Sequence, residues 1–306
     1  MNRPPERRDT PPAPPDIVHL LSFDVEEYFQ VEAAARCGIG RDDWAGLAPR
    51  LGPAVDRILQ ALSDHGASAT FFVLGWVAQH EAEVVRRIAQ AGHEIASHGC
   101  EHQMLQHLEP DDFRRDLLDS RRLLEDLSGR PVIGYRAPTF SVTRDTAWAF
   151  DVLAETGYRY DSSVFPIHHD RYGVPDAPAA AHRAVGPAGG TILEVPPLTC
   201  RLAGVNWPVG GGGYLRLLPV GVVGLAMRRA ARGGRPALLY LHPWELDPDQ
   251  PPLPMPWSAR LRHRIGLGRT AAKLDWLLAR FRFSSLSAQI DSLAASASET
   301  FAYGRP

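Results

Sequence analysis

The chain has 306 residues and a formal net charge of −2, with 44% hydrophobic and 22% charged residues. This length is enough for one large buried core, or for a domain that carries a sizeable insertion. A charge so close to zero gives no long-range attraction to nucleic acid or to an anionic membrane, so neither is expected as a partner. The three cysteines, Cys37, Cys100 and Cys200, have no paired spacing, which argues against a disulfide framework and a four-thiolate zinc site.

Both ends of the chain are expected to lie outside the folded domain. Residues 1–16 are rich in proline and charge, which predicts a disordered tail, and they lack the apolar stretch of a secretory signal. Residues 291–306 are expected to form a short C-terminal tail. No apolar run reaches the ~18 residues of a membrane span, so the sequence favours a cytoplasmic protein without a membrane-spanning segment.

From residue 17 onward, short apolar runs alternate with segments whose apolar residues recur at helical spacing. The apolar runs predict strands at residues 17–23, 69–74, 93–97, 132–135, 158–161, 191–195, 237–241 and 283–286. The amphipathic segments predict helices at residues 53–66, 81–91, 110–127, 144–157 and 261–281. Because this alternation implies parallel strands with helices outside them, the sequence predicts an α/β barrel over residues 17–290.

The alternation weakens between residues 165 and 236, where Pro and Gly cluster. This change predicts an insertion or accessory lobe within the barrel. The glycine run at residues 210–213 is not followed by the Lys-Ser/Thr pair of a phosphate-binding loop, so we interpret it as a flexible loop over a cleft.

Polar side chains stand at the carboxyl ends of the predicted strands, where α/β barrels carry their catalytic groups. These residues are Asp24, His98, Arg136, Asp161 and His242. Side chains two apart on a strand point to the same face, so Asp24 and Glu26 can act together while Glu27 points away.

The spacing of two histidines indicates a metal site. His98 and His102 are four residues apart after the third strand, which places both rings on one side of a helical turn or tight loop. Two imidazoles and one carboxylate leave a fourth position for water, the arrangement of a catalytic zinc site. Glu26 is the expected carboxylate ligand, with Glu27 as the open alternative. Cys100 is interpreted as a packing residue rather than a ligand.

The order of several short motifs carries a resemblance to a known family. In chain order they are Ser-Phe-Asp-x-Glu, Ala-Thr-Phe-Phe-Val-Leu-Gly, Gly-His-Glu-Ile-Ala-Ser-His-Gly-x-x-His, Tyr-Arg-Ala-Pro, Tyr-Asp-Ser-Ser and Leu-His-Pro-Trp-Glu. The chain resembles the polysaccharide deacetylase family, carbohydrate esterase family 4, over roughly residues 18–245, and is most similar to the bacterial subgroup associated with exopolysaccharide and exosortase gene clusters. The resemblance implies an irregular (β/α) barrel and metal-dependent removal of N-acetyl groups from amino-sugar polymers, usually with zinc.

The resemblance also implies roles for individual residues. Asp24 matches the general base, and His98 and His102 match the metal histidines. The family usually has a second aspartate next to the base, whereas this chain has Val25 there. The variant with one intervening residue fits Glu26 as the third ligand.

Four further residues match the family's catalytic positions. Arg136 matches the arginine that holds the base, and the backbone N–H of Thr139 matches an oxyanion-hole donor. His242 matches the general acid, and Asp161 matches the aspartate that orients it. The same Asp161 could instead cap a turn with the two serines that follow it.

Three aromatic residues are candidates for stacking on sugar rings, with burial in the core as the alternative. They are Trp207, Tyr214 and Trp244.

The expected reaction is release of acetate from an N-acetylated polysaccharide or oligosaccharide, with a divalent metal, most often Zn²⁺. One alternative is a metal-dependent hydrolase of a small amide or an O-acetyl ester, which could use the same site. A second is a non-catalytic carbohydrate-binding protein, which predicts a broken acid–base pair, yet Asp24 and His242 are both present.

Overall fold

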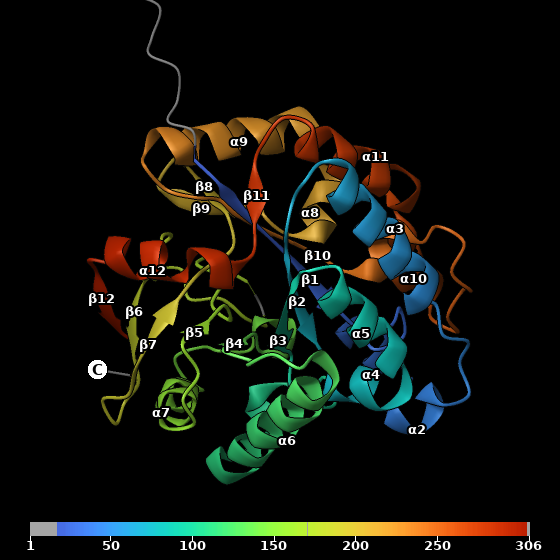
Figure 1. Ribbon diagram of the computed structural model, residues 1–306, viewed down its shortest axis with the longest axis horizontal. Helices are drawn as coiled ribbons and strands as arrows, with labels where there is room; N and C mark the ends of the chain where they lie inside the picture. Colours follow the sequence, from blue (N-terminus) through green and yellow to red (C-terminus); the bar gives the residue numbers. More distant parts are fainter. Residues whose placement is uncertain (1–16, 170, 305–306) are drawn as a thin grey trace, which may run out of the picture.

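The computed structural model describes residues 17–169 and 171–304, so the tail expected at residues 1–16 lies outside the described part of the chain. A ten-stranded, mostly parallel sheet runs through the protein, with helices packed around it (Figure 1). The strand order is β10-β1-β2-β3-β4-β5-β7-β6-β12, with β11 also paired to β1. One pairing of these strands, β6 with β7, is antiparallel.

The strands of this sheet are β1 (His19–Val25), β2 (Thr70–Val73), β3 (Glu94–Ser97), β4 (Gly134–Tyr135), β5 (Tyr160–Asp161), β6 (His182–Val185), β7 (Thr191–Glu194), β10 (Leu238–Leu241), β11 (Phe283–Ser284) and β12 (Thr300–Ala302). A separate antiparallel hairpin is formed by β8 (Thr199–Leu202) and β9 (Val205–Pro208).

The α-helices are α1 (Glu32–Ala35), α2 (Arg41–Trp44), α3 (Leu51–Asp64), α4 (Gly75–His80), α5 (Ala82–Gln90), α6 (Pro110–Ser128), α7 (Trp148–Glu155), α8 (Gly212–Leu217), α9 (Val220–Arg232), α10 (Trp257–Arg264), α11 (Leu267–Leu278) and α12 (Leu286–Ser296). Single 3₁₀ turns are η1 (Leu105–His107), η2 (Pro138–Phe140) and η3 (Pro243–Leu246). No helix within the described ranges is both long enough and apolar enough to cross a bilayer.

The α/β class is confirmed, and the predicted strands lie within a few residues of their expected positions. The helix expected at residues 261–281 is two helices, α10 and α11. They are separated at Gly266, which takes a left-handed conformation (φ 80°) that favours glycine and ends a helical run.

The region at residues 165–236, expected to be an insertion or accessory lobe, is corrected by the sheet pairing. Its strands β6 and β7 continue the main sheet, since β7 pairs in parallel with β5. Beyond β7 the chain crosses to β10, where the Leu198 N–H donates to the Leu238 carbonyl (2.9 Å). The region therefore joins two sides of the same sheet, and its weak periodicity reflects short strands between turns.

The C-terminal tail expected at residues 291–306 is also corrected. Residues up to Ser296 belong to α12, and β12 pairs in parallel with β6 at the end of the strand order. Tyr303 is fully buried, and its hydroxyl lies 2.7 Å from His182 Nε2. The long-range pairing leaves no local sequence signal, so a strand of three residues could not be recognised beforehand.

Strand β1 carries the residues on which the site is built. All seven of its residues are buried, because β2 pairs with one edge and β10 with the other while helices cover the sheet. The strands are parallel, so the carboxyl ends of β1, β3, β4, β5 and β10 lie at one edge of the sheet. Asp24, His98, Arg136, Asp161 and His242 all stand at these ends.

Candidate active site and metal centre

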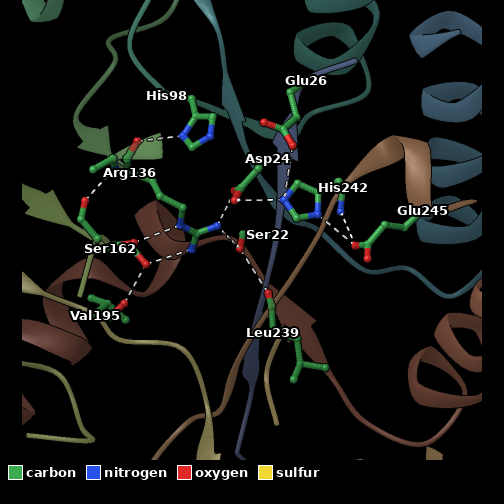
Figure 2. Close-up of polar contacts among 12 residues, drawn as sticks. Ser22, Asp24, Glu26, His98, Arg136, Ser162, Val195, Leu239, His242 and Glu245 are labelled. Atoms are coloured by element: carbon green, nitrogen blue, oxygen red, sulfur yellow. Dashed lines mark hydrogen bonds and ion pairs between the residues drawn. The ribbon is translucent and has the colours of Figure 1, made fainter. Parts of the chain in front are cut away.

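A fully buried arginine connects the strands beneath the site. The guanidinium of Arg136, after β4, donates to Asp24 Oδ1 (2.5 Å) and to Ser22 Oγ (2.9 Å), both on β1 (Figure 2). It also donates to the carbonyl (3.0 Å) and the hydroxyl (2.9 Å) of Ser162, after β5. One face lies 4.0 Å from the centroid of the Phe72 ring. These contacts give the buried charge a carboxylate partner and several oxygen acceptors, and they fix Asp24 in one orientation.

The second carboxylate oxygen of Asp24, Oδ2, faces the cleft. While Oδ1 accepts from Arg136, Oδ2 lies 3.9 Å from His242 Nε2. The same imidazole nitrogen lies 3.6 Å from Glu26 Oε1 (Figure 2). Asp24 and Glu26 therefore face the same space from the end of β1, as two residues of one strand face should.

The loop from His98 to His102 holds both imidazoles. His98 Nδ1 donates to the Arg136 carbonyl (2.8 Å), so its Nε2 carries the free lone pair. Burial lowers the pKa of His98 to about 4, which keeps the ring neutral as a metal ligand requires. His102 has a left-handed backbone (φ 53°), which is uncommon outside glycine and turns its ring back toward Glu26.

Neighbouring helices anchor this loop. The Cys100 N–H donates to Asp116 Oδ1 (2.9 Å) on α6, and the Gly75 N–H at the start of α4 donates to the Gly99 carbonyl (2.8 Å). The Cys100 thiol donates to the Asp116 carbonyl (3.6 Å), and burial raises its pKa. A thiol held protonated in this way is a packing group, as the sequence suggested.

The ligand atoms of Glu26, His98 and His102 lie within 4.8 Å of one another and fit one divalent cation. His102 Nε2 is 2.7 Å from Glu26 Oε2, so the imidazole and the carboxylate are in direct contact. Burial alone would raise the pKa of Glu26, but His102, His242 and His98 lower it to about 2, so the carboxylate is ionised.

The neighbouring Glu27 points to the opposite side of β1 and serves another element. Its Oε1 accepts from the backbone N–H groups of Arg50 (2.5 Å) and Leu51 (2.9 Å), at the N-terminus of α3. A carboxylate in this place satisfies helix donors that have no partner within the helix. The structure therefore brings Glu26, and not Glu27, together with the two histidines.

His242 is oriented by a glutamate that the sequence analysis did not assign. Its Nδ1 lies 3.0 Å from Glu245 Oε2, three residues further along in η3, and Nε2 faces Asp24 and Glu26 (Figure 2). Burial by itself lowers the pKa of His242, but the hydrogen bond and negative charge of Glu245, with Glu26 and Asp24, raise it to about 9. Arg216 Nε lies 2.8 Å from the other oxygen of Glu245. In the sequence, the His-x-x-Glu spacing of His242 and Glu245 was the signal that could have identified Glu245 as the partner of the imidazole.

Asp161 lies elsewhere, which corrects its expected contact with His242. Its Oδ1 accepts from Ser163 Oγ (2.5 Å), and the same Ser163 oxygen accepts from the Ala137 N–H (2.7 Å). Burial raises the pKa of Asp161 to about 6, next to the buried Glu194. Asp161 thus stabilises the turn in which Ser162 contacts Arg136. This place resembles the alternative role, a turn cap, that the sequence left open for Asp161.

Thr139 lines the cleft within η2 and has a left-handed backbone (φ 58°, ψ 23°). The next residue, Phe140, is also left-handed (φ 52°). A β-branched residue in this region costs of order 1–3 kcal/mol and persists only where the surroundings enforce it. The cleft, about 460 Å³, is lined by Asp24, Glu26, Val31, Glu32, Ala33, Arg36, Cys37, His98, His102, Thr139, Phe140, Arg171, Tyr172, Arg216, Tyr240, His242, Trp244, Ala259, Arg262 and His263.

The three aromatic candidates for sugar stacking have different places. Trp207 is exposed on the β8–β9 hairpin and Tyr214 packs edge-on against Phe165, and neither belongs to the cleft lining, so their contact with sugar stays a prediction. Trp244 does line the cleft, but it is buried. Its Nε1 donates to Glu26 Oε1 (3.3 Å), and its ring stacks on His242 (centroids 5.2 Å apart).

The glycine run at residues 210–213 packs tightly, which corrects its reading as a flexible loop. A Cβ on Gly210 would lie 2.7 Å from the Leu238 carbonyl, and one on Gly212 would lie 1.7 Å from Glu245 Oε2. Gly210, Gly211 and Gly212 pass so close to β10 and Glu245 that only glycine fits, whereas a Cβ on Gly213 would meet nothing closer than 3.9 Å. The run therefore supports the residue that orients His242.

Comparison with known families divides the chain close to Asp161. Residues 43–160 match the model described as polysaccharide deacetylase, and residues 162–291 match one described as a domain of unknown function, DUF3473. The second match covers the segment that supplies Ser162, His242 and Glu245. Residues from both matched regions therefore form the site.

Curated relatives match parts of the chain. It is 29% identical over 116 residues to a peptidoglycan deacetylase from Helicobacter pylori, covering 38% of each chain. It is 29% identical over 97 residues to a chitooligosaccharide deacetylase from Bradyrhizobium, covering 32% of this chain and 42% of that one. The chain thus spans less than half the length of these relatives.

A solved structure supports the fold over nearly the whole chain. A Mycobacterium smegmatis protein, solved as a candidate polysaccharide deacetylase, superposes with a TM-score of 0.60 at 22% identity. The match covers 97% of this chain and 99% of that one. The α/β architecture is therefore shared, including the region after β5.

Glu26→Gln is expected to weaken binding of Zn²⁺ by more than the roughly 10–100-fold that loss of an outer hydrogen bond costs, because it removes the anionic ligand. Glu27→Gln is the matched control and is expected to keep the affinity, since its carboxylate caps α3. Competition against a chelating indicator measures both. Equal affinities for the two variants would contradict the ligand assignment.

Gly212→Ala is expected to destabilise the protein by about 1–3 kcal/mol, because the new methyl group collides with Glu245. Gly213→Ala is the control. Its Cβ would meet nothing closer than 3.9 Å, and alanine favours the helix. Chemical denaturation of the two variants measures the difference. A stable Gly212→Ala protein with unchanged activity would show that Glu245 does not need this packing.

Proposed function

We propose that the protein, whose residues 43–160 match the polysaccharide deacetylase model, is a metal-dependent hydrolase that removes N-acetyl groups from an amino-sugar polysaccharide and releases acetate. The observation that carries the proposal is the acid–base pair beside the ligand cluster. Asp24 Oδ2 and His242 Nε2 face each other across 3.9 Å next to Glu26. Buried Arg136 contacts the other oxygen of Asp24, and buried Glu245 contacts the other ring nitrogen of His242.

The metal is proposed to be zinc. Two imidazoles and one carboxylate suit Zn²⁺ and leave a position for water, which is the donor set of catalytic zinc sites. A cation held by Glu26, His98 and His102 would polarise the acetyl carbonyl and make a bound water more acidic.

Asp24 is proposed to accept the proton of the attacking water. Arg136 occupies one of its oxygens and leaves the other directed into the cleft, so the base is aimed before substrate arrives. The hydroxide adds to the acetyl carbon. Negative charge then develops on the carbonyl oxygen, and the Thr139 N–H is proposed as a donor to it from the cleft wall.

His242 is proposed to donate the proton that lets the amine leave. Its raised pKa, about 9, keeps the imidazolium protonated at neutral pH, and Nε2 faces the cleft. As the C–N bond breaks, this proton passes to the nitrogen, which gives a free amino sugar and acetic acid. The intact acid–base pair favours hydrolysis over carbohydrate binding alone.

The names of the relatives favour an amino-sugar polymer. The matched curated proteins are named peptidoglycan and chitooligosaccharide deacetylases, and both substrates carry N-acetyl groups on amino sugars. The opening motif Asp-Val-Glu-Glu-Tyr-Phe and the long region after β5 favour the exopolysaccharide-associated subgroup, so an exopolysaccharide or its precursor is the proposed substrate.

Asp24→Asn is expected to lower acetate release from N-acetylglucosamine oligosaccharides at least ~100-fold, since the base is lost. The variant should still bind about one Zn²⁺ per chain, because Asp24 is not a ligand. An enzymatic acetate assay and elemental analysis measure the two properties. Unchanged acetate release from the zinc-loaded variant would rule out this role for Asp24.

Glu245→Gln is expected to move the alkaline limb of the kcat profile to lower pH by roughly 1–3 units. The Glu245 carboxylate raises the pKa of His242, and the acid works only while protonated, so losing that charge shortens the active range from the alkaline side. Glu27→Gln, whose carboxylate faces α3, should leave this limb in place. If the alkaline limb of the kcat profile stays at the same pH in Glu245→Gln, the role of His242 as the general acid is contradicted.

A further inference from the structure

Charge is distributed unevenly along the chain. Residues 195–274 carry eleven Arg and Lys side chains and three acidic ones, although the whole chain has a net charge of −2. No acidic residue stands between Glu194 and Glu245. Charges further apart than about 10 Å are largely screened at physiological ionic strength, so a partner surface responds to the local charge of this region rather than to the total.

Helix α10 lies in this basic region and presents apolar side chains to solvent. Trp257 is 72% exposed, Leu261 56% and Ile265 43%. They are four residues apart, so they form one stripe on and just after the helix. The opposite face carries His263, which is buried and lies 3.1 Å from Gln250. The helix is therefore amphipathic with its apolar stripe turned outward, the reverse of a core-packing helix.

Helix α8 extends the stripe. Leu217 at its end is 60% exposed, and the adjacent Arg216 Nη1 donates to the carbonyls of His263 (2.7 Å) and Ile265 (3.2 Å). These bonds hold the end of α8 against the end of α10. Leu217, Trp257, Leu261 and Ile265 are named here the α10 face.

Basic side chains flank the α10 face. Arg260 and Arg262 are exposed on α10 on either side of the stripe, and no acidic residue occurs between Asp249 and Asp275. Large apolar side chains bordered by arginines, with a tryptophan among them, are typical of helices that lie in the interface of an anionic bilayer. Two copies of this face would place like charges together, which disfavours self-association.

We infer that the α10 face docks on a membrane surface that bears anionic lipid headgroups. The apolar stripe inserts among the headgroups, and the arginines pair with their negative charges. This revises the expectation drawn from the net charge of the whole chain. Ala259, Arg262 and His263 of the same helix line the catalytic cleft, so docking holds the mouth of the cleft beside the lipid surface.

Vesicle flotation tests the inference without any substrate. The full chain is expected to bind vesicles of phosphatidylcholine with about a third phosphatidylglycerol, and not vesicles of phosphatidylcholine alone. Leu261→Ser and Arg260→Glu are each expected to weaken binding about tenfold or more, since each removes one of the two attractions. All variants should keep the stability of the parent protein, because both side chains are exposed.

A matched pair on α6 provides the control. Leu118 is 49% exposed on a helix with six acidic residues, and Arg115 is exposed beside it. Leu118→Ser and Arg115→Glu should bind anionic vesicles as the parent does. The inference is overturned if the parent does not bind anionic vesicles, if neutral vesicles bind equally well, or if the α10 and α6 variants behave alike. Self-association through this face, seen as a concentration-dependent mass that Leu261→Ser abolishes, would likewise overturn it.

Discussion

The arrangement of the site depends on one buried cation, the guanidinium of Arg136. An arginine removed from water must be paired and hydrogen-bonded, and breaking such a pair costs about 3–5 kcal/mol. Its partners come from the ends of different strands, Asp24 on β1 and Ser162 after β5. The backbone carbonyl of Arg136 accepts a hydrogen bond from His98 Nδ1. Satisfying this one charge therefore orients Asp24, the proposed base, and His98, a proposed metal ligand, together.

The positions of the candidate site residues could be predicted from the sequence, because they follow from strand geometry. Apolar runs locate parallel strands, and polar residues at their carboxyl ends meet at one edge of the sheet. The two-residue period of a strand separates Glu26 from Glu27, and the structure brings the former to the histidines. His98 and His102 follow from their spacing and their place after β3.

The positioning residues were harder to predict, because they depend on contacts between distant segments. Asp161 has the right place at a strand end, but its carboxylate turns to Ser163, while the imidazole of His242 meets Glu245 within its own turn. The close packing of Gly212 against that glutamate is invisible without the path of the chain. The same limit applies to β12, whose pairing with β6 joins segments more than a hundred residues apart.

We propose that the base and the carboxylate ligand are separate residues, with Asp24 held by Arg136 outside the metal shell. A crystal structure of the zinc-loaded protein, with anomalous scattering measured at the zinc edge, tests it most directly. One strong peak bonded to Glu26, His98 and His102 is expected, with Asp24 still paired to Arg136. A peak bonded to Asp24, or one that lacks Glu26 as a ligand, would contradict it.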